Sequence, residues 1–151
     1  MAKKKKKSFI TSKATINALR KLHAVSGGLL LPETVVDSAR DPKSPLHKHF
    51  DWDNTIAAEK WRLEQAGKLL RITVEYIDIK GSEVPQRVFV SLSDDQKSGG
   101  GYRATIDVLS DAKLRKQLLS DAMRDIVIFK NRYGHLKELA QVIRAMKKIK
   151  I

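Results

Sequence analysis

The chain contains 151 residues, of which 42% are apolar, so it is long enough for one domain with a single hydrophobic core and too apolar for wholesale disorder. It has no cysteine, which excludes disulfides, thiolate metal sites and cysteine nucleophiles and fits a reducing compartment. The net charge is +13, and the longest apolar runs span three or four residues, far fewer than the roughly 18 to 20 that a membrane-spanning helix needs. We therefore predict no association with a membrane.

The positive charge is concentrated at the two ends of the chain. Residues 1–28 contain eight basic and no acidic side chains, and residues 111–151 contain eleven basic and four acidic ones. The segment between them, residues 29–110, is close to neutral. A neutral middle with two basic ends is typical of a folded core that carries cationic surfaces for a polyanion. An acidic protein, an anionic lipid surface or simple solubility would account for the same charge.

Residues 1–12 are predicted to form a disordered basic N-terminal segment, because the consecutive lysines Lys3 to Lys7 repel one another and offer nothing apolar to pack. These lysines lead into a polar segment and not into the apolar stretch of a signal peptide. We therefore expect a cytoplasmic protein. Residues 13–151 are expected to form a single α+β domain.

Two short helices around a glycine turn are predicted next. Apolar residues have helical spacing over residues 13–25, Ser12 is a candidate N-cap, and Ser26-Gly27-Gly28 ends the helix. Pro32 begins a second helix that extends to Ala39. The pair resembles a helix-turn-helix, but many three-helix cores have the same pattern and the second helix is poor in basic residues. Sequence-specific DNA binding by this pair of helices stays an alternative.

A long helix is predicted from Asn54 to about Arg71, with Asp53 as its N-cap and Trp61 among its buried positions. After Arg71 the apolar period changes to two, which predicts three strands. The strands are expected over residues 72–76, 84–92 and 102–109, with residues 94–101 as a polar loop. Together they predict a three-stranded antiparallel meander.

The last part of the chain, from Ser110 onward, is predicted to be one long helix or a helix pair. Eight apolar residues there are spaced alternately by three and four, which is typical of a heptad seam. They are Leu119, Ala122, Ile126, Phe129, Tyr133, Leu136, Ala140 and Ile143. We favour packing of this seam against its own domain, and a homodimer stays an alternative. A break into two helices at Gly134 is the alternative to one continuous helix, because glycine destabilises a helix interior.

Few residues indicate enzymatic chemistry. His47, His49, Asp51 and Asp53 alternate along the chain and would share one face of an extended strand, as ligands of a metal do. Since Asp53 is also a helix cap and no distant ligand completes the set, we predict no metal, no cofactor and no enzyme, with a metal-dependent nuclease as a minor alternative. Gly99-Gly100-Gly101 leads into a predicted strand and not into a helix, so a hairpin loop is favoured over a phosphate-binding loop.

The basic ends predict contact with nucleic acid, DNA more than RNA. Lysine outnumbers arginine there, and lysine acts on phosphate as a point charge and not as a bidentate reader of bases. The candidate DNA-binding residues are Lys3, Lys4, Lys5, Lys6, Lys7, Lys13, Arg20, Lys21, Arg103, Arg144, Lys147, Lys148 and Lys150. We therefore expect phosphate contacts with low sequence specificity.

The block Ser44-Pro45-Leu46-His47-Lys48-His49-Phe50-Asp51-Trp52-Asp53, with similar segments between about residues 29 and 143, resembles a family of small phage and prophage proteins. The resemblance implies a phage-encoded protein in the cytoplasm of the host cell and assigns no catalytic residue. The expected function is accessory DNA binding for a phage. The alternative is a module that binds a host or phage protein, either through the segment Leu46 to Trp52, with His47, Phe50 and Trp52 as its interaction surface, or through the C-terminal seam.

Overall fold

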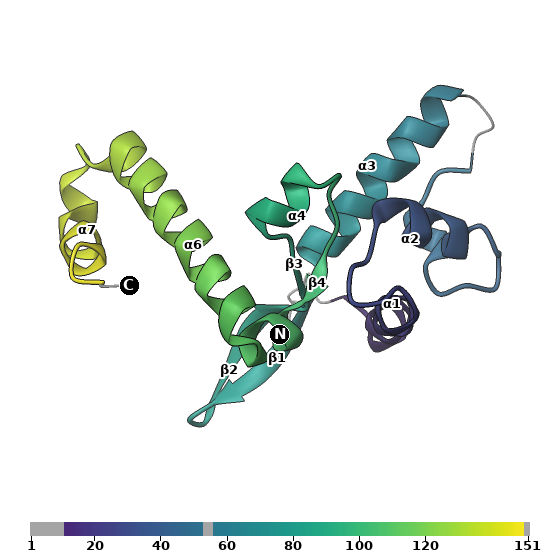
Figure 1. Cartoon of the computed structure of the whole chain (residues 1–151), viewed down its shortest axis with the longest axis horizontal. Coiled ribbons are helices and arrows are strands. Elements are labelled where there is room, and N and C mark those ends of the chain that lie inside the picture. The colour runs from purple at the N-terminus through teal and green to yellow at the C-terminus, as the bar shows by residue number, and fades with distance from the viewer. Residues whose placement is uncertain (1–10, 53–55, 150–151) are drawn as a thin grey trace, which may run out of the picture.

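The computed structural model describes residues 11–52 and 56–149 and shows a mixed α+β chain in two parts (Figure 1). The first part, which we call the body, contains all elements up to residue 110. The second part, which we call the arm, begins at residue 111 and extends away from the body as a long helix followed by a short one. No helix within the described ranges has both the length and the apolar character needed to cross a bilayer.

The body begins with two helices whose bounds agree with the prediction. Helix α1 (Lys13–Val25) is capped by Ser12, whose Oγ accepts the Thr15 N–H at 3.3 Å. Helix α2 (Pro32–Ala39) has its proline in the first turn, where the missing N–H costs nothing. Between them Gly27 and Gly28 have positive φ angles of 68° and 90°, so the glycines of the predicted turn are needed for its conformation.

The hydrophobic core lies where α1 and α2 pack against the long helix α3 (Ile56–Ile72). Its fully buried members include Leu19, Leu30, Val35, Leu46 and Leu70, each 0% exposed. Before α3, the chain makes one turn of 3-10 helix, η1 (His47–His49). The prediction that Trp61 is buried in α3 is wrong, because Trp61 is 55% exposed.

The predicted three-stranded meander is wrong, because the strands form two separate two-stranded antiparallel sheets. Strands β1 (Val74–Ile79) and β2 (Ser82–Arg87) form a hairpin, and β3 (Phe89–Val90) pairs with β4 (Arg103–Ala104). The partner changes at Val88, whose N–H donates to Thr73 O at 3.0 Å and whose carbonyl accepts the Thr105 N–H at 2.9 Å. The alternation of apolar and polar residues along residues 84–92, which predicted one strand, therefore runs through strands of two different sheets.

Two of the predicted segments between β3 and the arm also differ from the structure. Helix α4 (Ser93–Lys97) lies where a polar loop was predicted, and helix α5 (Thr105–Ser110) replaces most of the strand predicted over residues 102–109. Within that segment Val108 is 0% exposed and Ile106 is 70% exposed. These two residues would share a face in a strand, so their opposite burial fits a helix and not a strand.

The arm consists of α6 (Ala112–Tyr133), the 3-10 turn η2 (Lys137–Leu139) and α7 (Ala140–Met146). The Asp111 side chain caps α6, and Gly134 ends it. Of the two alternatives that the sequence left open, one long helix or a helix pair, the structure shows the helix pair. No residue of α6 is buried, and Ile143 is the one buried member of the predicted seam. The predicted packing of the whole seam against its own domain is therefore wrong.

Candidate nucleic-acid interface

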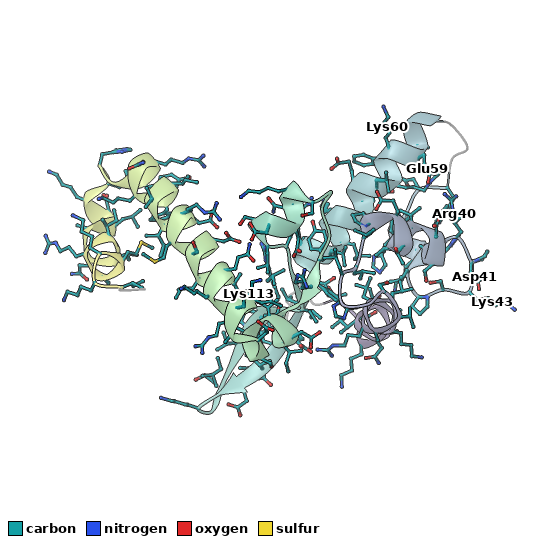
Figure 2. All side chains as sticks on the ribbon, viewed as in Figure 1. Arg40, Asp41, Lys43, Glu59, Lys60 and Lys113 are labelled. Atoms are coloured by element: carbon teal, nitrogen blue, oxygen red, sulfur yellow. The ribbon has the colours of Figure 1, made fainter. Side chains whose placement is uncertain are left out.

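The arm carries a dense set of exposed cations on both of its helices. Helix α6 has six basic and two acidic residues. Every basic side chain described in the arm is exposed, and the sticks in Figure 2 extend outward from α6 and α7. These residues are Lys113, Arg115, Lys116, Arg124, Lys130, Arg132, Lys137, Arg144, Lys147 and Lys148.

A groove of about 450 Å³ lies where α6 leaves the body, between α4 and the first turns of α6. Its polar lining combines four cations with hydroxyl and amide groups, which are the donors that hold phosphate oxygens in proteins. The lining residues are Ser93, Asp94, Lys97, Lys113, Lys116, Gln117, Ser120, Asp121 and Arg124.

The two carboxylates of this groove have partners within it. Asp121 accepts the backbone N–H of Ser93 at 2.9 Å and forms an ion pair with Arg124. Asp94 lies 3.6 Å from the Lys97 ammonium. Neither carboxylate forms an ion pair with Lys113 or Lys116 in the described part of the chain. The groove therefore presents two lysines whose charge is available to an anion.

The structure separates the candidate DNA-binding residues of the body from those of the arm. Lys13 and Lys21 are exposed on α1, which lies on the opposite side of the molecule from α7 (Figure 1). Arg20 pairs with Glu75 at 2.5 Å, so part of its charge is already neutralised. Arg144, Lys147 and Lys148 lie on or just after α7. Lys3, Lys4, Lys5, Lys6, Lys7 and Lys150 are outside the described residues.

Arg103 makes a two-pronged contact inside the body. Its Nε and Nη2 donate to the two carboxylate oxygens of Asp95, each at 2.7 Å, and Asp95 is 7% exposed. The hydrogen bond to Asp95 raises the pKa of the Arg103 guanidinium above its ordinary value. Arg103 thereby neutralises the charge of the buried Asp95 carboxylate, so we leave Arg103 out of the candidate DNA-binding surface.

The residues predicted to form an interaction surface are packed within the body. Phe50 is 7% exposed and belongs to the core. The His47 and Trp52 rings are stacked, with centroids 4.8 Å apart, and the Trp52 indole N–H donates to the His47 carbonyl at 3.0 Å. His47 Nδ1 lies 2.8 Å from the carbonyl oxygen of Ala39. These contacts make the segment a part of the fold.

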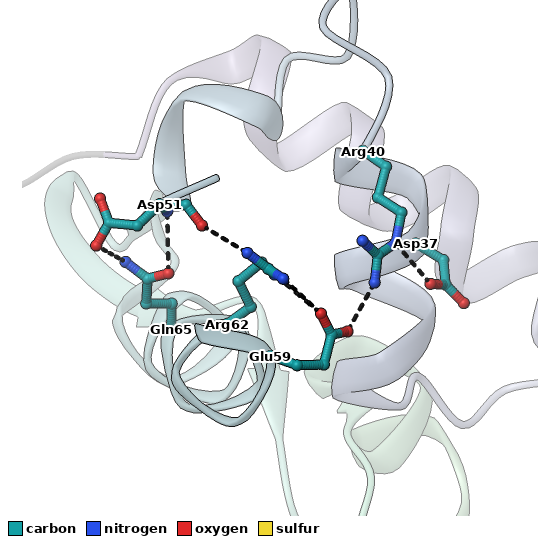
Figure 3. Close-up of polar contacts among 6 residues, drawn as sticks. All are labelled: Asp37, Arg40, Asp51, Glu59, Arg62 and Gln65. Carbon is teal, nitrogen blue, oxygen red and sulfur yellow. Dashed lines mark hydrogen bonds and ion pairs between the residues drawn. The ribbon is translucent and has the colours of Figure 1, made fainter. Parts of the chain in front are cut away.

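A network of hydrogen bonds and ion pairs connects this segment to α3 and to the end of α2 (Figure 3). The Arg62 guanidinium, 5% exposed, donates to Glu59 at 2.7 Å and to the Asp51 carbonyl at 3.1 Å. Glu59 also accepts from Arg40 at 2.7 Å. The hydrogen bond from Arg62, supported by the Arg40 charge, lowers the pKa of the Glu59 carboxyl although partial burial opposes the shift. The network explains why a charged arginine is tolerated in the core.

The histidines and aspartates considered as metal ligands contact other groups. Residues 47–49 form a 3-10 turn and not the extended strand that would align their side chains. His49 Nε2 lies 3.1 Å from Thr15 Oγ1, and Asp51 accepts the Trp61 and Gln65 N–H groups at 3.0 and 3.2 Å. Burial, followed by the Lys48 charge, lowers the pKa of His49. Asp53 is outside the described residues, and the described ones contain no group of three candidate ligands.

Lys113 and Lys116 of the groove were absent from the sequence-based candidates. Their spacing of three indicates one face of a helix, but the residues that complete the groove come from α4, some twenty positions earlier in the chain.

Comparison with models of known protein families, with curated proteins and with solved structures gave no match. The resemblance to phage and prophage proteins stays a prediction.

Proposed function

We propose that this protein binds DNA through its phosphates, with low sequence specificity, as an accessory protein of a phage. The observation that carries the proposal is α6, a helix of 22 residues that buries none of them and exposes six cations. A segment without buried residues contributes little to the stability of the body. Five of its six cations, all but Arg124, have no carboxylate partner in the described part of the chain and are available for a surface function.

The length of the arm suits duplex DNA. A helix of 22 residues is about 33 Å long, close to the roughly 34 Å of one turn of the double helix. The cations extend from Lys113 near its first turn to Arg132 near its last. Those cations of α6 that face a bound duplex would each contact a phosphate, and each contact releases counterions.

The chemistry of the cations favours phosphates over base edges. The described arm has six lysines and four arginines, and lysine does not make the bidentate contacts with which arginine reads guanine. The groove at the base of α6 adds serine and glutamine donors, which bind phosphate oxygens without sequence preference. The lysines Lys3 to Lys7 would add a further electrostatic contribution.

The proposal is tested by DNA affinity across a salt series. A variant with Lys113, Lys116, Lys147 and Lys148 changed to Gln is compared with wild type on a mixed-sequence duplex. If all four lysines contact phosphate, the slope of log affinity against log salt becomes shallower by about three to four. The control changes Lys43 and Lys60 to Gln, since both lie on the body far from the arm (Figure 2). Unchanged affinity and slope in the arm variant would remove the proposal.

The second candidate is a protein-binding role of the arm, which includes a homodimer. The observation that favours it is the exposure of Val127 (54%), Ile128 (55%) and Tyr133 (37%) on α6. Contacts made by such residues survive high salt, whereas phosphate contacts do not. Sedimentation of the protein at high salt separates the two, because a dimer held by the arm persists there and a Val127→Ser/Ile128→Ser variant would be monomeric.

A further inference from the structure

A second candidate binding site lies on α3, which Figure 1 shows on the other side of α4 from the arm. It is a pocket of about 320 Å³, within the usual range for small-molecule sites. It shares no residue with the groove between α4 and α6. Its lining residues are His49, Trp61, Glu64, Gln65, Lys68, Leu69, Arg71 and Ile72.

Trp61 is an exposed aromatic residue that the fold holds in place. Its indole N–H donates to Asp51 Oδ2 at 3.0 Å, and Gln65 Nε2 donates to the same carboxylate oxygen at 3.2 Å. Trp61 nevertheless stays 55% exposed, and Ile72, which lines the pocket three helical turns further along α3, is 54% exposed. A fixed and exposed indole loses little conformational entropy when a planar ring stacks on it.

The charged residues of the pocket favour an anion. Arg71 Nη1 donates at 3.2 Å to the Tyr102 hydroxyl, which is a neutral partner, and no carboxylate in the described part of the chain forms an ion pair with the Arg71 guanidinium. Gly67 provides the space, because a Cβ at that position would lie 3.1 Å from Arg71 Nη1. Lys68 is a second exposed cation in the lining, and Glu64 is its one carboxylate. An anionic group is therefore attracted beside the indole.

We propose that this pocket binds an aromatic ring that carries a phosphate, as in a nucleoside monophosphate. The base would stack on Trp61, while Lys68 and Arg71, which lie two to three helical turns further along α3, would bind the phosphate. The same unit occurs as a free nucleotide and as an unpaired residue of single-stranded DNA. The site does not depend on the arm.

The test follows the indole N–H signals of the two tryptophans in a proton–nitrogen correlation spectrum. The Trp61 signal is assigned by its loss in Trp61→Phe, and the Trp52 signal is the internal control because Trp52 bonds to the His47 carbonyl inside the body. Deoxyadenosine monophosphate, a short single-stranded oligodeoxyadenylate and deoxyadenosine are titrated separately. We expect the Trp61 signal to shift with the first two, and deoxyadenosine to bind more weakly because it lacks the phosphate.

Variants separate stacking from charge. Trp61→Ala, followed through the amide signals of α3, weakens binding about tenfold, within the range for the loss of one base–aromatic stack, whereas Trp61→Phe retains most of the affinity because it keeps an aromatic face. Lys68→Ala and Arg71→Ala weaken binding of the monophosphate and leave that of deoxyadenosine unchanged. Lys60→Ala, an exposed lysine of the same helix outside the pocket, has no effect. The four-lysine arm variant keeps this binding, so failure of the proposed function is distinguishable from failure here.

Three results would overturn the inference. They are the absence of a Trp61 shift with both the nucleotide and the strand at millimolar concentration, equal affinity in Trp61→Ala, and equal binding of deoxyadenosine and its monophosphate. A shift with the strand alone supports the site and identifies single-stranded DNA as the source of the unit. A shift with the monophosphate alone supports the site and identifies a free nucleotide.

Discussion

The body and the arm differ in what their apolar residues contact. In the body Leu19, Leu30, Leu46 and Leu70 are each 0% exposed, whereas the described part of the arm has Ile143, 8% exposed, as its one buried residue. Burial of such side chains supplies most of the favourable free energy of folding. The stability of the protein therefore depends on the body, and the arm is free to change its surface with little effect on folding.

The two regions also differ in how their cations are used. In the body Arg20, Arg40, Arg62 and Arg103 all have carboxylate partners. In the described part of the arm the ion pair with a carboxylate is that of Arg124 with Asp121. Nine of the ten described Lys and Arg residues of the arm have no carboxylate partner, against nine of the fourteen in the described part of the body, which is more than twice as long. Unpaired positive charge is therefore denser on the arm although basic residues occur throughout the chain. The location of unpaired charge, and not its total, determines where a polyanion would bind.

The largest effect that separates the regions is expected from truncation of a leucine in each. Leu46→Ala removes a side chain that is 0% exposed and should lower the free energy of unfolding by about 2 to 5 kcal/mol. Leu119→Ala removes one that is 40% exposed and should lower it by about 0.5 kcal/mol or less. Urea denaturation of both variants measures the difference. Similar losses would mean that the arm packs as a core element in solution.

A smaller effect is expected from the glycines that were considered as a phosphate-binding loop. Gly101 has a φ angle of +131°, and a Cβ there would lie 2.7 Å from Leu29 Cγ, so Gly101→Ala should lower the free energy of unfolding by about 2 kcal/mol. Gly100 also has a positive φ, but nothing lies within 4 Å of its Cβ position. Gly100→Ala is therefore the matched control and should cost about 1 kcal/mol. Thermal denaturation of the two variants checks this order, and the reverse order would contradict a packing role for Gly101.

The sequence predicts the first two helices well because their signals are local. Ser12 as an N-cap, Pro32 in a first turn and the glycines at 27 and 28 each act on the backbone within a few positions. Gly134 is a local signal too, but it left two alternatives open, because the cost of one glycine in a helix interior is small enough for packing to override. The strands are less predictable, because the change of partner at Val88 depends on Thr73 and Thr105, which are distant in the chain.

The candidate sites are predictable only in part. The sequence locates the positive charge of the C-terminal end, but it does not show that Asp95 neutralises Arg103 or that α4 completes a groove with Lys113. Trp61 has the spacing of a buried residue on α3, and only the tertiary structure shows that the core contacts other faces of that helix. Periodicity indicates which residues share a face and not what covers it.

Arg103 and Lys113 provide a third comparison between body and arm. Arg103→Ala leaves the Asp95 carboxylate, 7% exposed, without its partner and should lower the free energy of unfolding by about 1 to 2 kcal/mol, while DNA affinity per folded molecule stays unchanged. Lys113→Ala should leave stability unchanged and make the salt slope of DNA binding shallower by about one. Urea denaturation and the salt series are run on both variants. A loss of DNA affinity in folded Arg103→Ala would return Arg103 to the candidate surface.

The smallest expected effect is the pH dependence of stability that His49 gives to the body. Burial and the Lys48 charge lower the pKa of His49 below its ordinary value of 6.5, so between the folded-state pKa and 6.5 the unfolded chain binds more protons than the folded one. The free energy of unfolding should therefore fall as the pH is lowered through this interval. His49→Gln should remove this part of the slope in urea denaturation, because glutamine does not titrate. His135→Gln, which changes an exposed side chain of the arm, should keep the slope, and its loss there would show that protonation of the arm also affects the stability of the body.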